Sequence, residues 1–493
     1  MNFLISSLLC LLLTWVLVQA FHSTRRGSKA SSSNLPPGPR RLPIFGNLFD
    51  LGDKPHKSLA KLAETHGPVM SLKLGSLITV VVSTEKTAKE VLQKHDLTFS
   101  NRTIIDAVRA CRHNEVGLPW IPVSPLWRNL RKVCTMHLFS SQKLYANQYL
   151  RRKKIQELTA NIKKSCHTGE AINIGQEAFN TSINLLSNTI FSIDLVDPNS
   201  PLAREFRKTM WGIVKLAGKP NLADYFPILR KIDPLGVRSK MTIHFDKMLD
   251  LFGKMFDERL QSRKAQGSTA SSDMLDALVD NIIEGDSEEL NKTHVTHLLL
   301  VLFVAGTDTT SSTLEWAMAE LLRNPQVLSK AKQELKQAVG KGNPVQESDI
   351  IRLPYLQAII KETFRMHPAA PLLVPRRAGA NAEICGFTVP EGAQVFVNAW
   401  AIGRDPSIWE NPSAFMPERF LGSDIDVKGR DFVLIPFGAG RRICPGLPLA
   451  NRMLHLMLGS LIHSFDWKLE GGILPKDMNM EENLGLRAIP ILV

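Results

Sequence analysis

The chain has 493 residues, of which 44% are hydrophobic, so it exceeds the usual single-core size of roughly 250–300 residues and can bury a large, lobed core. It shows neither low-complexity tracts nor repeats of solenoid period, which excludes an extensively disordered chain and a repeat array. The formal net charge of +13 indicates a solvated basic surface, or attraction to an acidic partner or an anionic membrane. Nucleic-acid binding is not expected, because no basic run interleaves with aromatic residues.

The N-terminal residues 3–21 form an almost unbroken apolar run, FLISSLLCLLLTWVLVQAF. As a helix this run would extend about 28 Å, close to the hydrocarbon thickness of a bilayer. A cleaved signal peptide is the alternative, but it needs positive charge before its apolar core. Here the charges Arg25, Arg26 and Lys29 follow the run. We therefore expect a transmembrane anchor, and the positive-inside rule places the rest of the chain in the cytosol.

A linker follows the anchor over residues 22–40, which are basic and then proline-rich. Its last part reads LPPGPR. Adjacent prolines fix φ and favour a stiff, extended chain. The sequence thus predicts three regions: an anchor over 3–21, a linker over 22–40, and a globular domain over 41–493.

The globular region is predicted to be mainly α with small β-sheets. Residues 69–82 indicate two strands interrupted near Gly75, and residues 384–397 indicate strands again. Periodic apolar residues from about 85 to 360 favour helices. Residues 294–323 form one long helical stretch that Asn324-Pro325 ends, and residues 447–465 form an apolar helix.

Six widely separated cysteines form no CxxC pair, so a disulfide framework or a structural zinc site is not expected. One of them, Cys444, lies in the segment PFGAGRRICPG, residues 436–446. Its glycines allow tight turns and close approach to a flat ligand. Cys444 precedes an apolar helix, whose N-terminal amides favour an anion and lower the pKa of a thiol.

This segment resembles the haem-binding loop of cytochromes P-450, F-G-x-G-R-x-C-x-G, in the R-R-x-C-P-G form typical of plant enzymes. The resemblance implies the cytochrome P-450 fold, preceded by the transmembrane helix, and makes residues 41–493 a haem-thiolate monooxygenase domain. It implies that Cys444 is the ligand of the iron of haem b, iron protoporphyrin IX. It also places a further group of residues at the cofactor: Phe437, Gly438, Arg442 and Gly446.

Glu362 and Arg365 stand three residues apart on a predicted helix, so they share one face. In isolation such a pair is usually a surface ion pair. In this position it resembles the E-x-x-R motif of the family, and Pro417-Glu418-Arg419-Phe420 matches the associated P-E-R-F segment. The resemblance implies that Arg419 completes a buried triad. Because buried charges must satisfy one another, we assign these three residues to structure.

The segment AGTDTT, residues 305–310, places residues of poor helix propensity in the middle of the long helix. A threonine hydroxyl that bonds to the carbonyl four residues earlier would bend that helix. The segment resembles the A-G-x-D/E-T motif of the family. The resemblance implies that Asp308 and Thr309 are catalytic and relay protons during dioxygen reduction, and that Ala305 and Gly306 pack beside the haem.

Trp127 and Arg131 resemble the W-x-x-x-R helix of the family. Their spacing places two donors on one helical face, where both suit a carboxylate such as a haem propionate. Arg376 is a further propionate candidate by resemblance, although its neighbour Arg377 competes for the role.

Residues 184–198, 218–229 and 304–325 resemble plant terpenoid hydroxylases of the geraniol 8-hydroxylase type. This implies dioxygen and a small lipophilic substrate, a monoterpene alcohol such as geraniol, with a diterpenoid or other specialised metabolite as the alternative. The predicted pocket includes Val304, Leu372 and Leu373. The resemblance further implies that electrons come from NADPH through a separate flavoprotein, the NADPH-cytochrome P-450 reductase. No GxGxxG fingerprint follows a strand here, so the chain is not expected to take hydride itself. The resemblance also implies the endoplasmic reticulum membrane, with one span and the catalytic domain facing the cytosol.

One departure from the family lies near the C-terminus, where residues 486–490 directly follow residues 481–485. Relatives usually carry a hairpin between these two segments that reaches into the pocket. Three alternatives stay open: a haem-thiolate isomerase or dehydratase that uses no dioxygen, a haem carrier or sensor, and an inactive paralogue in which the missing hairpin is the lesion.

Overall fold

The computed structural model describes residues 34–196, 201–266, 273–283 and 290–482, together with Ser7, Thr14 and Trp15. Nearly all of the predicted anchor therefore lies outside the described residues, as does the segment that follows Glu482. Among the residues that are described, no helix is both long enough and apolar enough to span a bilayer.

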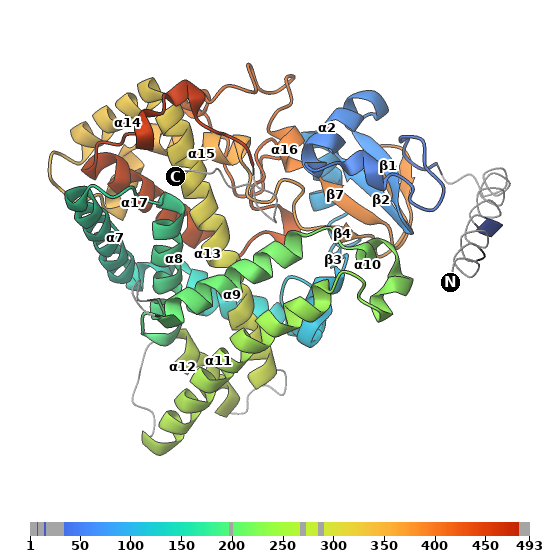
Figure 1. Cartoon of the computed structure of the whole chain (residues 1–493), viewed down its shortest axis with the longest axis horizontal. Coiled ribbons are helices and arrows are strands. Elements are labelled where there is room, and N and C mark those ends of the chain that lie inside the picture. Colours follow the sequence, from blue (N-terminus) through green and yellow to red (C-terminus); the bar gives the residue numbers. More distant parts are fainter. Residues whose placement is uncertain are drawn as a thin grey trace. The chain divides into compact units, whose positions relative to one another are not determined.

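The chain folds into two compact units, each assembled from three separate segments (Figure 1). The smaller unit consists of Met1–Thr103, Asn221–Leu235 and Leu372–Ile402. The larger unit consists of Ile104–Pro220, Gly236–Pro371 and Gly403–Val493.

The smaller unit is built on a five-stranded sheet with strand order β1-β2-β7-β4-β3. β1 and β2 form an antiparallel hairpin that turns at Gly75, where φ is +59° and glycine carries no steric penalty. The two strands predicted over residues 69–82, with their break near Gly75, are thus confirmed. The strands of this sheet are β1 (Val69–Leu74), β2 (Leu77–Val82), β3 (Asn101–Arg102), β4 (Arg376–Arg377) and β7 (Gln394–Val397).

A second, two-stranded sheet pairs β5 (Ala382–Ile384) with β6 (Phe387–Val389). The predicted strands between residues 384 and 397 are therefore present as β6 and β7. The core of the unit is a cluster in which Leu59 of α2 packs against Met70, Leu72 and Val81. The helices of this unit are α2 (Pro55–His66), α3 (Glu85–Lys89), α10 (Leu222–Tyr225) and α16 (Ala399–Ile402).

The larger unit is helical, which confirms the mainly α class. Its helices are α4 (His113–Val116), α5 (Pro125–Cys134), α6 (Ser141–Ala146), α7 (Gln148–Thr168), α8 (Ile174–Phe191), α9 (Pro201–Gly218), α11 (Val237–Gln266), α12 (Met274–Ile283), α13 (Lys292–Arg323), α14 (Pro325–Ala338), α15 (Pro354–Met366) and α17 (Leu447–Ser464).

The long helix α13, drawn in yellow in Figure 1, is the central element of the larger unit. Asn291 caps its first turn by accepting from the amide of His294, and the helix ends at Asn324 before Pro325. The predicted span of 294–323 is therefore confirmed with two extra residues at the start. α13 contacts α8, α11, α15 and α17, so almost every face of it is covered.

Two hydrophobic clusters lie along α13. One joins its first half to α8, α9 and α11 through Leu298, Leu299 and Phe303. The other joins its second half to α7, α14, α15 and α17 through Leu314 and Met318. Burying one such side chain contributes roughly 1.5–3 kcal/mol, so α13 is held in place by packing along its full length.

Candidate active site

The loop that precedes α17 closes on itself at Cys444. The amide of Cys444 donates to the carbonyl of Phe437 across 3.0 Å. Gly438 and Gly440 make the turns between them at φ +70° and +68°, where only glycine is unstrained. Leu447 then begins α17, as predicted. The loop therefore holds Cys444 at the N-terminal end of a buried helix.

The Cys444 side chain is exposed, yet burial is the largest influence on the pKa of its thiol and raises it. This combination indicates a thiol that is surrounded by protein but faces open space. Hydrogen bonds from the amides of Gly446 and Leu447, and the charge of Arg131, act in the opposite direction on the pKa. The sequence predicted a lowered pKa from those amides; that prediction is wrong for the protein alone, because desolvation of the sulfur outweighs them.

The middle of α13 carries an open stripe, which we define as Val301, Ala305 and Thr309. Ala305 and Thr309 are exposed and Val301 is half-buried, whereas Phe303 and Thr307 between them are buried. Since residues four apart share one face of a helix, the stripe marks an open space along an otherwise covered helix. α13 packs against α17, and Cys444 lies in the loop just before α17. The exposed thiol and the open stripe therefore belong to neighbouring elements.

Within this segment the threonine hydroxyls bond to carbonyls one turn earlier, as the sequence predicted. Thr309 Oγ1 donates to the carbonyl of Ala305 across 2.7 Å. Asp308 is 4% exposed, and its carbonyl accepts from the hydroxyl of Ser311. The structure therefore places Thr309 on the open stripe and Asp308 beside it on a buried face.

Gly306 has a packing reason to be glycine. A Cβ at this position would come within 2.8 Å of Leu186 Cδ1 on α8, so α8 and α13 could not approach as closely. Its predicted position beside a cofactor stays a prediction. Val304 is half-buried and packs against the cluster that joins α13 to α11.

Trp127, Arg131 and Arg442 form a cationic cluster around one indole ring. The guanidinium carbons of Arg442 and Arg131 lie 4.9 Å and 5.6 Å from the ring centre of Trp127. Arg131 Nη2 donates to the carbonyl of Ile443 across 2.6 Å, and Arg442 donates to the carbonyls of Leu118 and Ile121. Among the described residues Arg131 has no carboxylate partner, so a negative group from outside the chain would be stabilised there.

Phe437 and Gly446 flank the thiol along the chain. The ring of Phe437 meets Phe364 of α15 edge-on, with ring centres 5.2 Å apart. A Cβ on Gly446 would lie 3.7 Å from Cys444 Sγ, which is an ordinary contact distance. Gly446 is therefore next to the sulfur, and its amide is one of the sulfur's hydrogen-bond donors.

The remaining predicted site residues belong to the smaller unit. Arg376 on β4 is 4% exposed and donates to the carbonyl of Phe99, and it lies 3.8 Å from Asp96. Its neighbour Arg377 is exposed, so of the two arginines Arg376 is the inward-facing one. Leu372 packs against the core of this unit, and Leu373 adopts a left-handed backbone with φ +51°, a conformation that is strained for leucine.

The structure brings Glu362, Arg365 and Arg419 together. Glu362 accepts two bonds of 2.7 Å from Arg365 and one of 3.1 Å from Arg419. Arg365 also donates to the carbonyls of Gly403, Pro412 and Ala414. The group connects α15 to the segment of residues 403–419. The side chains of Glu362 and Arg365 are fully buried, so the group stabilises the fold and takes no part in chemistry.

These features fit a haem. An exposed thiol at a helix N-terminus suits an iron, and amide donors to the sulfur tune such a ligand. Arg131 and Arg442 suit the two carboxylates that haem carries. Ala305, the smallest side chain of the open stripe, leaves room for a flat ring system beside α13.

Sequence reasoning missed one further pair, His113 and His297. Their Nδ1 atoms lie 2.8 Å apart, the rings stack at 20°, and each residue is 4% exposed. The two residues are 184 positions apart, so only the packing of α4 against α13 reveals them. A partial signal existed: His297 precedes Val301 by four residues and so lies one turn earlier on the same face of α13, although it is buried.

Comparison with known proteins agrees with this geometry. Residues 36–493 match the family model for cytochrome P-450. The chain is 56% identical to geraniol 8-hydroxylase of Swertia mussotii, covering 96% of this chain and 94% of that protein. It is 53% identical to geraniol 8-hydroxylase of Catharanthus roseus over 98% of each, and 54% identical to drimenol monooxygenase of Persicaria hydropiper over 94% of this chain and 93% of that protein.

The fold and these similarities define an oxidoreductase that works with haem. The chain belongs to the cytochrome P-450 family and is a cytochrome P-450 monooxygenase. The family implies a haem cofactor, a redox partner that supplies electrons, and a lipophilic substrate that reacts with dioxygen.

Proposed function

We propose that this monooxygenase hydroxylates an acyclic monoterpene alcohol of the geraniol type, with Cys444 as the thiolate ligand of haem b. The observation that carries the assignment of the site is the exposed thiol at the start of α17, which packs against the helix that bears the open stripe. When bound, the haem supplies dioxygen activation and the insertion of one oxygen atom into a C–H bond. The diterpenoid and other specialised-metabolite substrates are the alternative.

The chain's own residues would hold the cofactor and move protons. Arg131, Arg442 and Trp127 would bind carboxylates of the cofactor beside α5. Arg376 stays a further candidate by resemblance. Thr309 is exposed on the open stripe, and its hydroxyl would deliver a proton to that side after leaving its bond to the Ala305 carbonyl. Asp308 would resupply the proton from the buried side.

The substrate assignment rests on similarity and on the apolar character of the predicted pocket. Two of the compared relatives bear the name geraniol 8-hydroxylase and a third is named for drimenol. Val304, Leu372 and Leu373 are apolar, as a terpenoid site requires. Residues 483–490, where the family hairpin is absent, lie outside the described residues.

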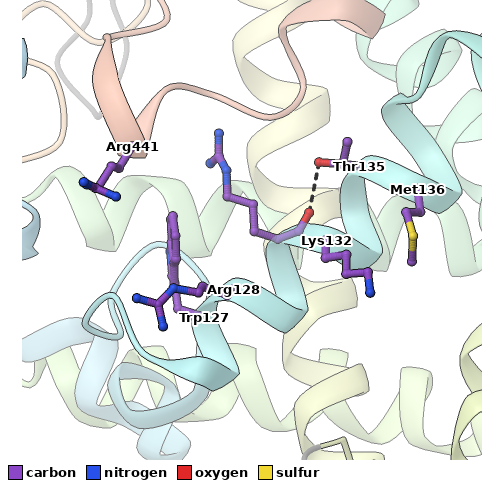
Figure 2. A pocket seen from close by; sticks show the side chains of 7 residues that line it. Trp127, Arg128, Lys132, Thr135, Met136 and Arg441 are labelled. Carbon is purple, nitrogen blue, oxygen red and sulfur yellow. Dashed lines mark hydrogen bonds between the residues drawn. The ribbon is translucent and has the colours of Figure 1, made fainter. Parts of the chain in front are cut away.

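The electron donor would be an NADPH-dependent flavoprotein reductase that docks on a basic surface. An open depression of about 390 Å³ is lined by Trp127, Arg128, Arg131, Lys132, Thr135, Met136 and Arg441. Figure 2 shows Arg441 on the Cys444 loop above the helix that carries Arg128 and Lys132. Clustered positive charge of this kind attracts an acidic protein and steers its approach.

We also propose attachment to the endoplasmic reticulum membrane through one span. Residues 3–21 would form the anchor and residues 22–40 the linker, with the domain 41–493 facing the cytosol. The smaller unit supports contact with a bilayer. Its surface carries a set of exposed apolar side chains: Leu42, Phe45, Phe49, Ile228 and Ile232.

These apolar residues come from two segments that lie together. The rings of Phe45 and Phe226 are 6.2 Å apart, and the turn at Gly75-Ser76 bonds to the carbonyls of both Phe45 and Tyr225. Arg230 and Lys231 stand between Ile228 and Ile232. Apolar side chains interleaved with basic ones are typical of a surface that lies in the headgroup region of an anionic bilayer.

The test is expression in microsomes with a plant reductase, followed by product analysis by mass spectrometry. We expect a ferrous–CO band of the thiolate type, oxidation of geraniol, and a requirement for both NADPH and dioxygen. Cys444→Ser should abolish the band, whereas Cys166→Ser, at an exposed cysteine of α7, should keep it. Turnover of diterpenes but not of geraniol would establish the alternative, and a band that persists in Cys444→Ser would refute the ligand assignment.

A further inference from the structure

The His113–His297 pair is a polar feature inside an apolar part of the larger unit. His113 comes from α4 and also meets the ring of Phe245 on α11 edge-on, with ring centres 5.0 Å apart. Phe245 belongs to the cluster of buried apolar residues that joins α11 to α13 and that also contains Val295 and Leu298. Within the described part of the chain, neither imidazole has a hydrogen-bond partner other than the second imidazole.

The pair lies in line with the open stripe of α13. His297, Val301, Ala305 and Thr309 follow one another at intervals of four residues, so each lies next to the following one on the helix surface. Over these twelve residues the row turns by about 120° around the helix axis. His297 precedes Ala305 by eight residues, which is about 12 Å along the helix at 1.5 Å per residue. The open stripe thus follows directly after a buried polar residue, His297, and runs through Val301 and Ala305 to Thr309.

Both imidazoles are neutral at ordinary pH. Burial lowers the pKa of His113 to about 3 and that of His297 to about 4, and nearby His294 lowers the latter further. In a neutral pair joined through Nδ1 atoms, one ring donates its Nδ1–H and the other accepts. The first ring then has a bare Nε2, an acceptor, and the second has an Nε2–H, a donor. The pair therefore offers one donor and one acceptor, which is what an alcohol group uses when it both accepts and donates.

The spacing fits the proposed substrate. An extended acyclic monoterpene alcohol measures roughly 10 Å from its oxygen to its far methyl group, at ~1.2 Å per bond along the chain. Two of the similar proteins are named for oxidation of geraniol at position 8, which by chemical numbering is the end of the chain away from the hydroxyl. An alcohol held at His297 would place that end near Ala305, one turn of the helix before Thr309.

We propose that His113 and His297 together bind the hydroxyl group of the substrate and so determine which end of the molecule is oxidised. This inference rests on the proposed function, because it assumes a terpenoid alcohol. The two histidines act by positioning the substrate: they touch the alcohol, while the oxidised carbon lies near Ala305. A substrate without a hydroxyl would leave the pair without its ligand and lose this orientation.

The test compares geraniol with the hydrocarbon that carries a hydrogen where geraniol carries its hydroxyl. It uses the full-length holoenzyme with reductase, and measures kcat/KM and the position of oxidation for both compounds. We expect the wild type to prefer the alcohol about tenfold or more, the size of one net hydrogen bond. In the double variant His113→Phe/His297→Phe this ratio should fall to about one, and geraniol should be oxidised at more than one position.

The double variant removes both partners, so it leaves no buried imidazole unsatisfied. His455→Phe is the matched control, since His455 is also 4% exposed but bonds to the carbonyl of Asn451 on α17; it should keep the wild-type ratio. His297→Asn provides a second variant that retains a donor and an acceptor on a shorter side chain. It should bind geraniol more weakly in a spectral titration while its affinity for the hydrocarbon is unchanged.

The outcomes separate the two proposals. If the wild type oxidises alcohol and hydrocarbon with equal kcat/KM, or if the double variant keeps the wild-type ratio and product position, the assignment of the histidines is overturned while the terpenoid function stands. If the wild type shows the ferrous–CO band but oxidises neither compound, the proposed substrate class fails, and the assignment of His113 and His297 to the substrate hydroxyl fails with it.

Discussion

Glu362 and Arg365 form a two-pronged ion pair on α15 in which both side chains are 0% exposed. Both bonds are 2.7 Å long, and Arg419 adds a third contact to the same carboxylate. Removing one member of a buried ion group leaves the others charged and unpaired, which typically costs about 3–5 kcal/mol. The group therefore holds α15 and the segment around residues 403–419 in one arrangement.

We predict that Glu362→Gln lowers the free energy of unfolding by about 3–5 kcal/mol, because two arginines lose their counter-charge. The measurement is chemical denaturation of the purified holoenzyme, with haem release followed in parallel. The matched control is Asp466→Asn, which breaks the ion pair with Lys332 at a side chain that is 97% exposed. Equal effects of the two substitutions would show that burial of the triad contributes nothing.

Thr309→Ala should reduce the product formed per NADPH oxidised by about tenfold or more, since general acid–base groups typically contribute a factor of 10² to 10⁴. Thr309 is exposed on the open stripe, where its hydroxyl would deliver a proton once it leaves the Ala305 carbonyl. Thr313→Ala is the control: Thr313 makes the same bond to a carbonyl one turn earlier, but it is 4% exposed. Product yield and peroxide release are quantified for each. A Thr309→Ala enzyme with wild-type yield per NADPH would remove Thr309 from the proton path.

Acid should destabilise the protein partly through His113 and His297. The pKa values of these residues are lowered to about 3 and about 4 by burial, whereas the unfolded chain has ordinary imidazoles of pKa near 6.5. Between pH 6.5 and 4 the unfolded state binds protons that the folded state does not, so stability is complete above pH 6.5 and falls as the pH decreases. The double variant His113→Phe/His297→Phe should show a shallower fall in denaturation midpoint across that window. The pH profile of His455→Phe is measured for comparison, because burial also lowers the pKa of this single histidine to about 4. A pH profile of the double variant that equals that of the wild type would contradict a neutral pair.

The features that could be predicted from the sequence are those set by residues close together in the chain. The hairpin turn at Gly75, the end of α13 before Pro325 and the shared face of Glu362 and Arg365 all follow from local geometry. The His113–His297 pair could not be predicted, because it depends on how α4 packs against α13. The pKa of Cys444 was predicted in the wrong direction for a related reason: the amides that lower it are local, whereas the burial that raises it comes from the whole fold.

The exposed apolar residues of the smaller unit should lie in the lipid headgroup region. We predict that Trp fluorescence from Ile228→Trp, in the full-length protein reconstituted into nanodiscs, is quenched by brominated lipid beyond the wild-type level. Ile351→Trp should show no added quenching. The two positions are matched in exposure, at 82% and 83%, but Ile351 belongs to the larger unit and lacks the neighbouring apolar set. Equal quenching at both positions would argue against a membrane-facing role for this surface.

Electron delivery should depend on the basic depression that Arg128, Lys132 and Arg441 help to line. We predict that Lys132→Glu/Arg441→Glu raises the KM for reductase about tenfold at low salt and flattens its dependence on ionic strength, because attraction between exposed charges is screened over about 10 Å at 0.1 M salt. The ferrous–CO band formed with a chemical reductant should stay at the wild-type level, since neither substitution touches the sulfur. Lys336→Glu, an exposed lysine on α14, changes the net charge in the same sense and should leave the KM nearly unchanged. A reductase KM and a salt dependence that the double substitution does not alter would place the docking surface elsewhere on the chain.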